Sequence, residues 1–132
     1  MPPNNPTFTL LINDMHTTIF KEIWQRDIMP LQGTTIKTQT RQLTNEIVAV
    51  TGTHLTRISS NHRESSIPYE KFEIVFNELL KNGTITRKQI DTLNKSIHPK
   101  IRAASIMMAV FVKVKGTHYI HETGELVWLD SF

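Results

Sequence analysis

The sequence predicts an α+β fold, in which an N-terminal helix and a small antiparallel sheet precede a second group of helices and a C-terminal hairpin. Three observations predict it. Apolar residues recur at helical spacing near the N-terminus, β-branched residues alternate with polar ones from residue 34 to 67, and helical spacing returns after Pro68. A chain of 132 residues can form two small halves, which we expect at 1–67 and 68–132, packed as one compact unit.

The composition is that of a protein with a buried core. Hydrophobic residues make up 39% of the chain and charged residues 20%, which separates it from disordered chains. The absence of cysteine excludes disulfides, thiolate nucleophiles and cysteine-ligated zinc. The apolar run 10–12 is too short for a signal sequence or a membrane span, so we expect an unprocessed cytoplasmic protein that makes no membrane contact.

The first half has the pattern of one helix followed by short strands. Apolar residues recur every four positions from Leu11 to Ile23 and predict a helix over about 13–28, which Pro30 ends. Alternating β-branched residues then predict short antiparallel strands. Three of them are expected at 34–40, 47–50 and 55–58, and after a polar loop over 59–66 a fourth short strand is an alternative at 66–67.

The second half begins with two helices that have clear end signals. Pro68 begins the first of them, and Asn82-Gly83 ends it. A very short extended link follows at residues 84–85. Thr86 has the side chain and the position of an N-cap, so we expect the second helix to begin directly after it.

A third helix and a hairpin complete the predicted order. Pro99 is expected to begin the third helix, whose end stays open because residues 110–114 also alternate like a strand. The last part of the chain predicts a β-hairpin with a glycine in its turn. Its strands are expected at 117–121 and 126–129, on either side of Gly124.

Positive charge is concentrated in one third of the chain. The net charge is +3, yet residues 1–80 hold seven Lys or Arg against eight acids. Residues 81–118 hold eight Lys or Arg and a single acid, Asp91, whereas residues 119–132 hold three acids and no Lys or Arg. A localised basic patch is typical of a nucleic-acid site, so the charge pattern favours a polyanionic partner.

Residues 68–129 resemble a winged helix-turn-helix domain. The expected order of helix, short strand, helix, helix and hairpin is the order of that family. LLKNGTITRKQI (79–90) is similar to the family's junction between its first and second helices, and IRAASIMMAVF (101–111) is similar to its third helix. Together with segment 34–67, the chain is similar to small sheet-plus-winged-helix modules of bacterial restriction and regulatory proteins.

This resemblance implies a partner and a set of contact residues. The partner is double-stranded DNA, with the third helix in the major groove and the hairpin near the backbone. The contact residues are basic side chains in the second helix, at the start of the third helix and on the strand that enters the hairpin, with one serine a turn further into the third helix. We therefore expect DNA contacts from Arg87, Lys88, Lys95, His98, Lys100, Arg102, Ser105, Lys113 and Lys115.

Two other functions stay open on the same scaffold. The third helix is apolar almost all round, and the hairpin turn carries Glu122 and Glu125, which a phosphate would repel. A protein-interaction or homodimerisation module is therefore the alternative to DNA binding. Phe20 and Trp24 are expected to pack on the small sheet, the alternative being a contact with the same helix of a second subunit.

The sequence favours a binding protein over an enzyme. His54, Asn61 and His62 loosely imitate a nuclease motif, but their spacing is unspecific and no strand pattern of a metal-dependent nuclease surrounds them. We therefore expect no catalytic residue, no metal and no cofactor. The most specific role that the sequence favours is that of a regulator or a recognition component of a restriction-type system.

Overall fold

The computed structural model describes residues 19–129 and confirms the α+β class. Residues 19–23 are helical, and this first helix continues through η1 (Trp24–Ile28) and η2 (Met29–Leu31). The helical turns therefore include Pro30, which lies in η2 and not beyond the helix. Residues 13–18 of the predicted first helix lie outside the described residues.

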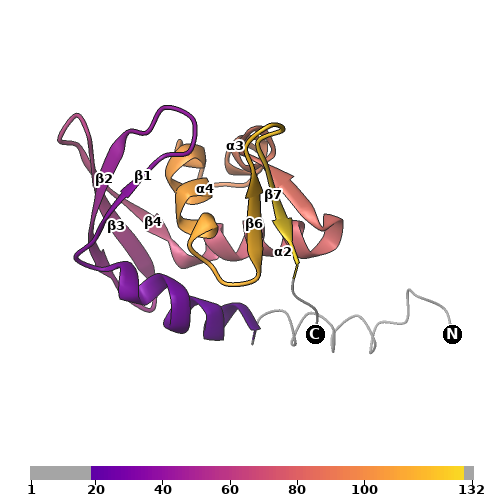
Figure 1. The fold of residues 1–132 in the computed structure, drawn as a ribbon. Helices are drawn as coiled ribbons and strands as arrows, with labels where there is room; N and C mark the ends of the chain where they lie inside the picture. The colour runs from indigo at the N-terminus through magenta and orange to yellow at the C-terminus, as the bar shows by residue number, and fades with distance from the viewer. Residues whose placement is uncertain (1–18, 130–132) are drawn as a thin grey trace, which may run out of the picture.

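A four-stranded antiparallel sheet follows the first helix, in the order β1-β2-β3-β4 (Figure 1). The polar loop expected over 59–66 is shorter than predicted, because Glu64 and Ser65 already pair with strand β3. The fourth strand is therefore present and longer than expected. The strands are β1 (Thr35–Lys37), β2 (Thr44–Val50), β3 (His54–Ser59) and β4 (Glu64–Pro68).

The second half contains three helices and a three-stranded sheet in the order β5-β7-β6. Its local end signals act as predicted. Gly83 ends α2 in a left-handed conformation with φ of 78°, and Thr86 forms a capping box with Gln89 at the start of α3. The elements are α2 (Tyr69–Asn82), β5 (Thr84–Thr86), α3 (Arg87–Ser96), α4 (Ala104–Val112), β6 (Thr117–Ile120) and β7 (Glu125–Trp128).

The predicted start of the third helix is wrong. Helix α4 begins at Ala104, five residues after Pro99, and residues 97–103 form an irregular linker with bends at residues 97–99. Two contacts hold this linker, one to α2 and one to the end of α3. The Lys71 ammonium donates a hydrogen bond to the Ile97 carbonyl at 2.5 Å, and the Ile101 amide donates to the Asn94 carbonyl at 3.3 Å.

The end of that helix, left open by the sequence, lies at Val112, and residues 113–116 form a turn before β6. The strand alternative for residues 110–114 is therefore wrong. As a consequence, Lys113 and Lys115 lie in a turn and not on a strand that enters the hairpin.

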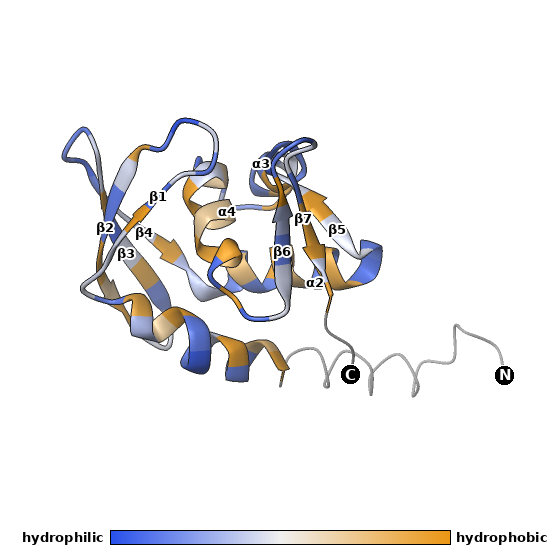
Figure 2. Ribbon diagram, viewed as in Figure 1, coloured by the Kyte–Doolittle hydropathy of each residue, from blue (hydrophilic) through white to orange (hydrophobic). Residues whose placement is uncertain are grey.

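Helix α4 is the centre of the molecule. Figure 1 shows it between the four-stranded sheet and the β6–β7 hairpin, and its residues contact β1, α3 and β6. Figure 2 shows α4 mostly in the colours of apolar residues. Seven of its nine residues are buried, and Ser105 is its one exposed residue. An α-helix that is apolar all round must be covered on every side, so both halves of the chain pack against it.

Aromatic rings join the first helix to this core. Phe20 stacks on Phe76 with ring centroids 4.9 Å apart, and Trp24 lies edge-on to Phe72 at 5.3 Å. The Trp24 indole also donates a hydrogen bond to the Thr51 carbonyl at 2.8 Å. The two aromatic residues of the first helix are thus buried within this chain, against α2 and the end of the sheet, and are not left for a second subunit.

A buried carboxylate fastens the first helix to the turn after α4. Asp27 accepts two hydrogen bonds from the Arg26 guanidinium, at 2.9 and 2.6 Å, and one from the Lys115 amide at 3.1 Å. Burial by itself raises the pKa of the Asp27 carboxyl. The hydrogen bonds and positive charges of Arg26 and Lys115 outweigh burial and hold this pKa below its ordinary value.

The low pKa of Asp27 predicts a pH-dependent effect of Asp27→Asn. A carboxylate whose pKa is lower in the folded state stabilises the fold above its ordinary pKa of about 4, and this stability is lost as the pH falls through the folded value. We expect the variant to lose about 1–3 kcal/mol of unfolding free energy at pH 7 and less at pH 3. Urea denaturation at both pH values measures this, with the exposed Glu22→Gln as control. An equal loss at pH 7 and pH 3 would contradict the assignment.

Candidate functional site

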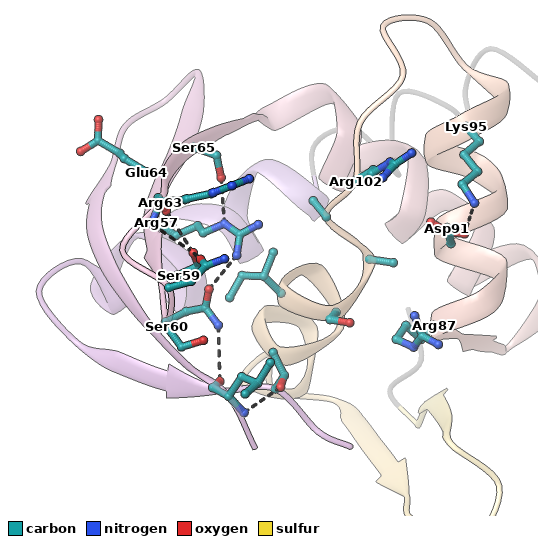
Figure 3. Close-up of a pocket in the computed structure, with 18 residues that line it drawn as sticks. Arg57, Ser59, Ser60, Arg63, Glu64, Ser65, Arg87, Asp91, Lys95 and Arg102 are labelled. Atoms are coloured by element: carbon teal, nitrogen blue, oxygen red, sulfur yellow. Dashed lines mark hydrogen bonds and ion pairs between the residues drawn. The ribbon is translucent and has the colours of Figure 1, made fainter. Parts of the chain in front are cut away.

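A cavity of about 850 Å³ opens between the four-stranded sheet and the second group of helices. Figure 3 shows its two walls, with Arg57 on β3, Arg63 in the β3–β4 turn and Arg87, Asp91 and Lys95 on α3, and with Arg102 on the linker between them. The lining therefore contains five cationic side chains and two acids, Asp91 and Glu64. In Figure 3 Glu64 points away from the arginines.

One face of the sheet forms both the core and a wall of this cavity. Residues paired across antiparallel strands share a face, so the pairs Leu55–Ile67 and Arg57–Ser65 lie on the same side of the sheet. Leu55 and Ile67 are buried in the core, whereas Arg57 and Ser65 line the cavity. The inner face is thus apolar at one end of the strands and polar at the other.

Arg57 is held in place by neutral hydrogen bonds. Its Nε donates to the Ser65 hydroxyl at 2.8 Å, and its Nη1 donates to the Oδ1 atom of Asn45 at 2.7 Å. Within residues 19–129 no carboxylate forms an ion pair with Arg57. Burial lowers the pKa of the Arg57 guanidinium because desolvation disfavours its charged form. An anion in the cavity would compensate for this loss of solvent.

The opposite wall is a stripe of α3. Arg87, Asp91 and Lys95 are spaced four residues apart, which places them on one side of the helix. Lys95 and Asp91 form an ion pair at 2.8 Å. Arg87 is exposed and has no ion pair in the described part of the chain. Thr86 caps the helix directly before Arg87, so the helix start fixes the position of this arginine.

The linker and the start of α4 form the third side of the cavity. Arg102 is exposed, and Ala103, Ala104 and Ser105 line the cavity beside it. Ala103 is the N-cap of α4 and supplies no side-chain acceptor to the first turn. The positive end of the helix dipole therefore adds to the positive potential of the arginines.

A second cavity of about 280 Å³ adjoins the first. The two share Thr38, Leu43, Arg87 and Ser105 in their linings, so they lie side by side. The second cavity adds Arg41 from the β1–β2 loop and Tyr119 from β6. We call the two cavities together the cationic groove.

The structure divides the nine predicted contact residues into three groups. Arg87, Lys95, Arg102 and Ser105 line the cationic groove. Three further residues are exposed but do not line it: Lys88, His98 and Lys100. Lys113 and Lys115 lie beyond the other end of α4, which separates them from Arg102 by roughly the 13 Å length of a nine-residue helix. The basic residues of the second half therefore do not form one surface.

The sequence prediction missed Arg41, Arg57, Arg63 and Tyr119. The three arginines belong to the first half of the chain, whose overall charge is close to neutral, so the charge distribution hid them. A signal for Arg57 was nevertheless present. It alternates with the apolar Leu55 on a predicted strand, and a charged residue at an inward position indicates either a buried partner or a site.

The residues of the loose nuclease motif are not brought together. His54 begins β3, and its ring contacts the Thr53 hydroxyl at 2.9 Å. His62 follows the end of the same strand, so roughly 20 Å of extended chain separates the two histidines. The Asn61 side chain accepts a hydrogen bond from the Ser59 hydroxyl in that turn.

The anchoring of Arg57 predicts the effect of Asn45→Ala. Asn45 is buried, and its removal leaves a half-buried guanidinium without one of its acceptors. We expect the unfolding free energy to fall by about 1–3 kcal/mol, as measured by urea denaturation. Thr56→Ala, which removes a hydroxyl from the other face of β3, is expected to cost less than about 1 kcal/mol. Equal effects of the two changes would show that Arg57 does not depend on Asn45.

No helix within residues 19–129 combines the length and the apolar character that crossing a membrane requires. Comparisons with protein-family models, with curated proteins and with solved structures give no match to this chain. The residues and geometry of the cationic groove are therefore the basis for any functional conclusion.

Proposed function

We propose that this protein binds nucleic acid and that the sugar–phosphate backbone lies in the cationic groove. The single observation that carries the proposal is the meeting of cations from three separate parts of the chain. Arg57 and Arg63 come from β3 and the β3–β4 turn, Arg87 from α3 and Arg102 from the linker. None of these four is in an ion pair within the described residues, so their charges are available to a ligand.

The chemistry of arginine suits phosphate. A guanidinium presents a planar fork of donors that matches two oxygens of a phosphate group, and it stays charged at every physiological pH. Each phosphate that is neutralised releases counterions, so binding through several arginines has to weaken steeply as salt rises. The order of elements from α2 to β7 also supports the proposal, since the winged-helix resemblance implies the same order.

The proposal differs from the sequence prediction in the surface that it uses. A third helix that reads a major groove needs a row of exposed side chains. In α4 only Ser105 is exposed, because the sheet, α3 and β6 cover the rest. We therefore assign the contacts to the groove beside the start of α4 and not to an inserted helix.

A salt titration tests the proposal. Fluorescence anisotropy is measured with labelled mixed-sequence oligonucleotides, both single-stranded and duplex. We expect binding at about 50 mM salt, and we expect the logarithm of the binding constant to fall linearly with the logarithm of the salt concentration. The double variant Arg87→Ala/Arg102→Ala is expected to weaken binding about tenfold or more and to lower the salt slope by about two. Both side chains are exposed, so the fold should persist.

The chain offers a matched control of equal charge change. Lys113→Ala/Lys115→Ala also removes two exposed cations, at the opposite end of α4. We expect this pair to change affinity less than about threefold, because charges beyond the Debye length of about 10 Å are screened. Binding of neither oligonucleotide would overturn the proposal. Equal losses in the two double variants would show that net charge and not the groove is responsible.

A further inference from the structure

The cationic groove has the composition of a binding site for one strand of nucleic acid. Across its two cavities it carries six cationic side chains and two acids, and one of these acids, Asp91, is already paired with Lys95. The cations are Arg41, Arg57, Arg63, Arg87, Lys95 and Arg102. They are therefore distributed along the whole groove and not gathered at one point.

Cations lie on both walls of the groove. Arg57 on β3 and Arg63 in the β3–β4 turn face the side of α3 that carries Arg87 and Lys95, as Figure 3 shows. The negative charge of a single sugar–phosphate backbone between these walls would be neutralised by cations on both sides. A duplex is a stiff convex rod with its phosphates on the outside, so we expect it to contact such a groove mainly at its rims.

One end of the groove provides an aromatic ring. Tyr119 lines the second cavity and is partly exposed, and its ring and the His121 ring are nearly perpendicular, at 81°, with centroids 4.9 Å apart. The neighbouring hairpin turn carries Glu122, an exposed acid that disfavours a phosphate there. An uncharged base can stack on Tyr119, since every base has a flat aromatic face.

The middle of the groove provides a fixed anchor. Arg57 is held at two nitrogens by Asn45 and Ser65, so its position is set before any ligand binds. A side chain that is already ordered loses little conformational freedom on binding. Arg57 is thus suited to fix one phosphate of the ligand. From there the nucleic-acid strand would continue past Arg87 toward Tyr119.

We propose that the cationic groove binds single-stranded nucleic acid, with the phosphates against its arginines and one base stacked on Tyr119. A charged groove combined with an aromatic platform is the general design of single-strand binding sites. This inference rests on the proposed function and adds the strandedness of the ligand.

The test compares the two forms of one sequence. A labelled mixed-sequence oligonucleotide is measured by anisotropy at one salt concentration, alone and as a blunt duplex with its complement. We expect the single strand to bind about tenfold more tightly or better. Equal or tighter binding of the duplex would overturn this inference and leave the proposed function standing. Binding of neither form would overturn both.

Variants at the Tyr119 end locate the stacked base. Tyr119→Leu is expected to weaken single-strand binding about tenfold, and Tyr119→Phe, which keeps the ring, less than about threefold. Tyr119 also packs against the core, so its replacement could destabilise the protein. Arg41→Ala in the exposed β1–β2 loop is therefore a second test that leaves the core unchanged. We expect it to weaken single-strand binding severalfold, whereas Lys88→Ala, an exposed cation outside the groove, is expected to have no effect. If Tyr119→Leu folds and binds normally, or if Arg41→Ala and Lys88→Ala behave alike, the assigned path is wrong.

Discussion

The burial of α4 is the constraint on which the rest of the structure depends. This helix has no polar face, so a two-layer arrangement that leaves one side in water would expose a row of large apolar side chains. The chain covers it with β1 on one side and with α3 and β6 on others. Neither half of the chain could bury α4 alone, which explains why the sheet of the first half packs against the second half.

The same constraint creates the groove. At the N-terminal end of α4 the inner face of the four-stranded sheet lines the cavity and no longer the core. Its residues change accordingly, from Ile47 and Leu55 in the core to Asn45 and Arg57 beside the cavity. The groove thus lies where the inner face of the four-stranded sheet and the second group of helices, which both pack on α4, are no longer in contact. Cations from both surfaces line it because each surface is solvated at this point.

The local signals of the sequence predict most of the elements but not how they come together. Gly83 and the capping box at Thr86 determine helix ends by backbone chemistry within a few residues, so these predictions hold. Pro99 misleads, because proline suits a first helical turn but equally suits an extended link. Here Ile97 and Ile101 form hydrogen bonds with the two preceding helices, and the linker between them is not helical. Such contacts cannot be read from neighbours in sequence.

The candidate site was predictable only in part, for a related reason. Counting charges along the chain finds Arg87 and Arg102 but treats Lys113 and Lys115 as equivalent to them, although α4 separates the two pairs. Counting charges cannot find Arg57, because that residue lies in the site only as a result of the packing of the sheet on α4. The apolar pattern of α4 already indicated a buried helix, and it was the better guide to where the sheet would lie.

The convergence of the two walls is tested most directly by the side-chain Nε–Hε signals of the arginines in ¹⁵N NMR spectra. During titration with a single-stranded oligonucleotide, we expect the signals of Arg57 on the sheet and of Arg87 and Arg102 on the other side to shift together and saturate at the same ligand concentration. Arg26, beside Asp27 at the far end of α4, is predicted to stay unchanged. Shifts confined to one wall, or a larger shift at Arg26 than at Arg57, would show that the two walls do not form one site.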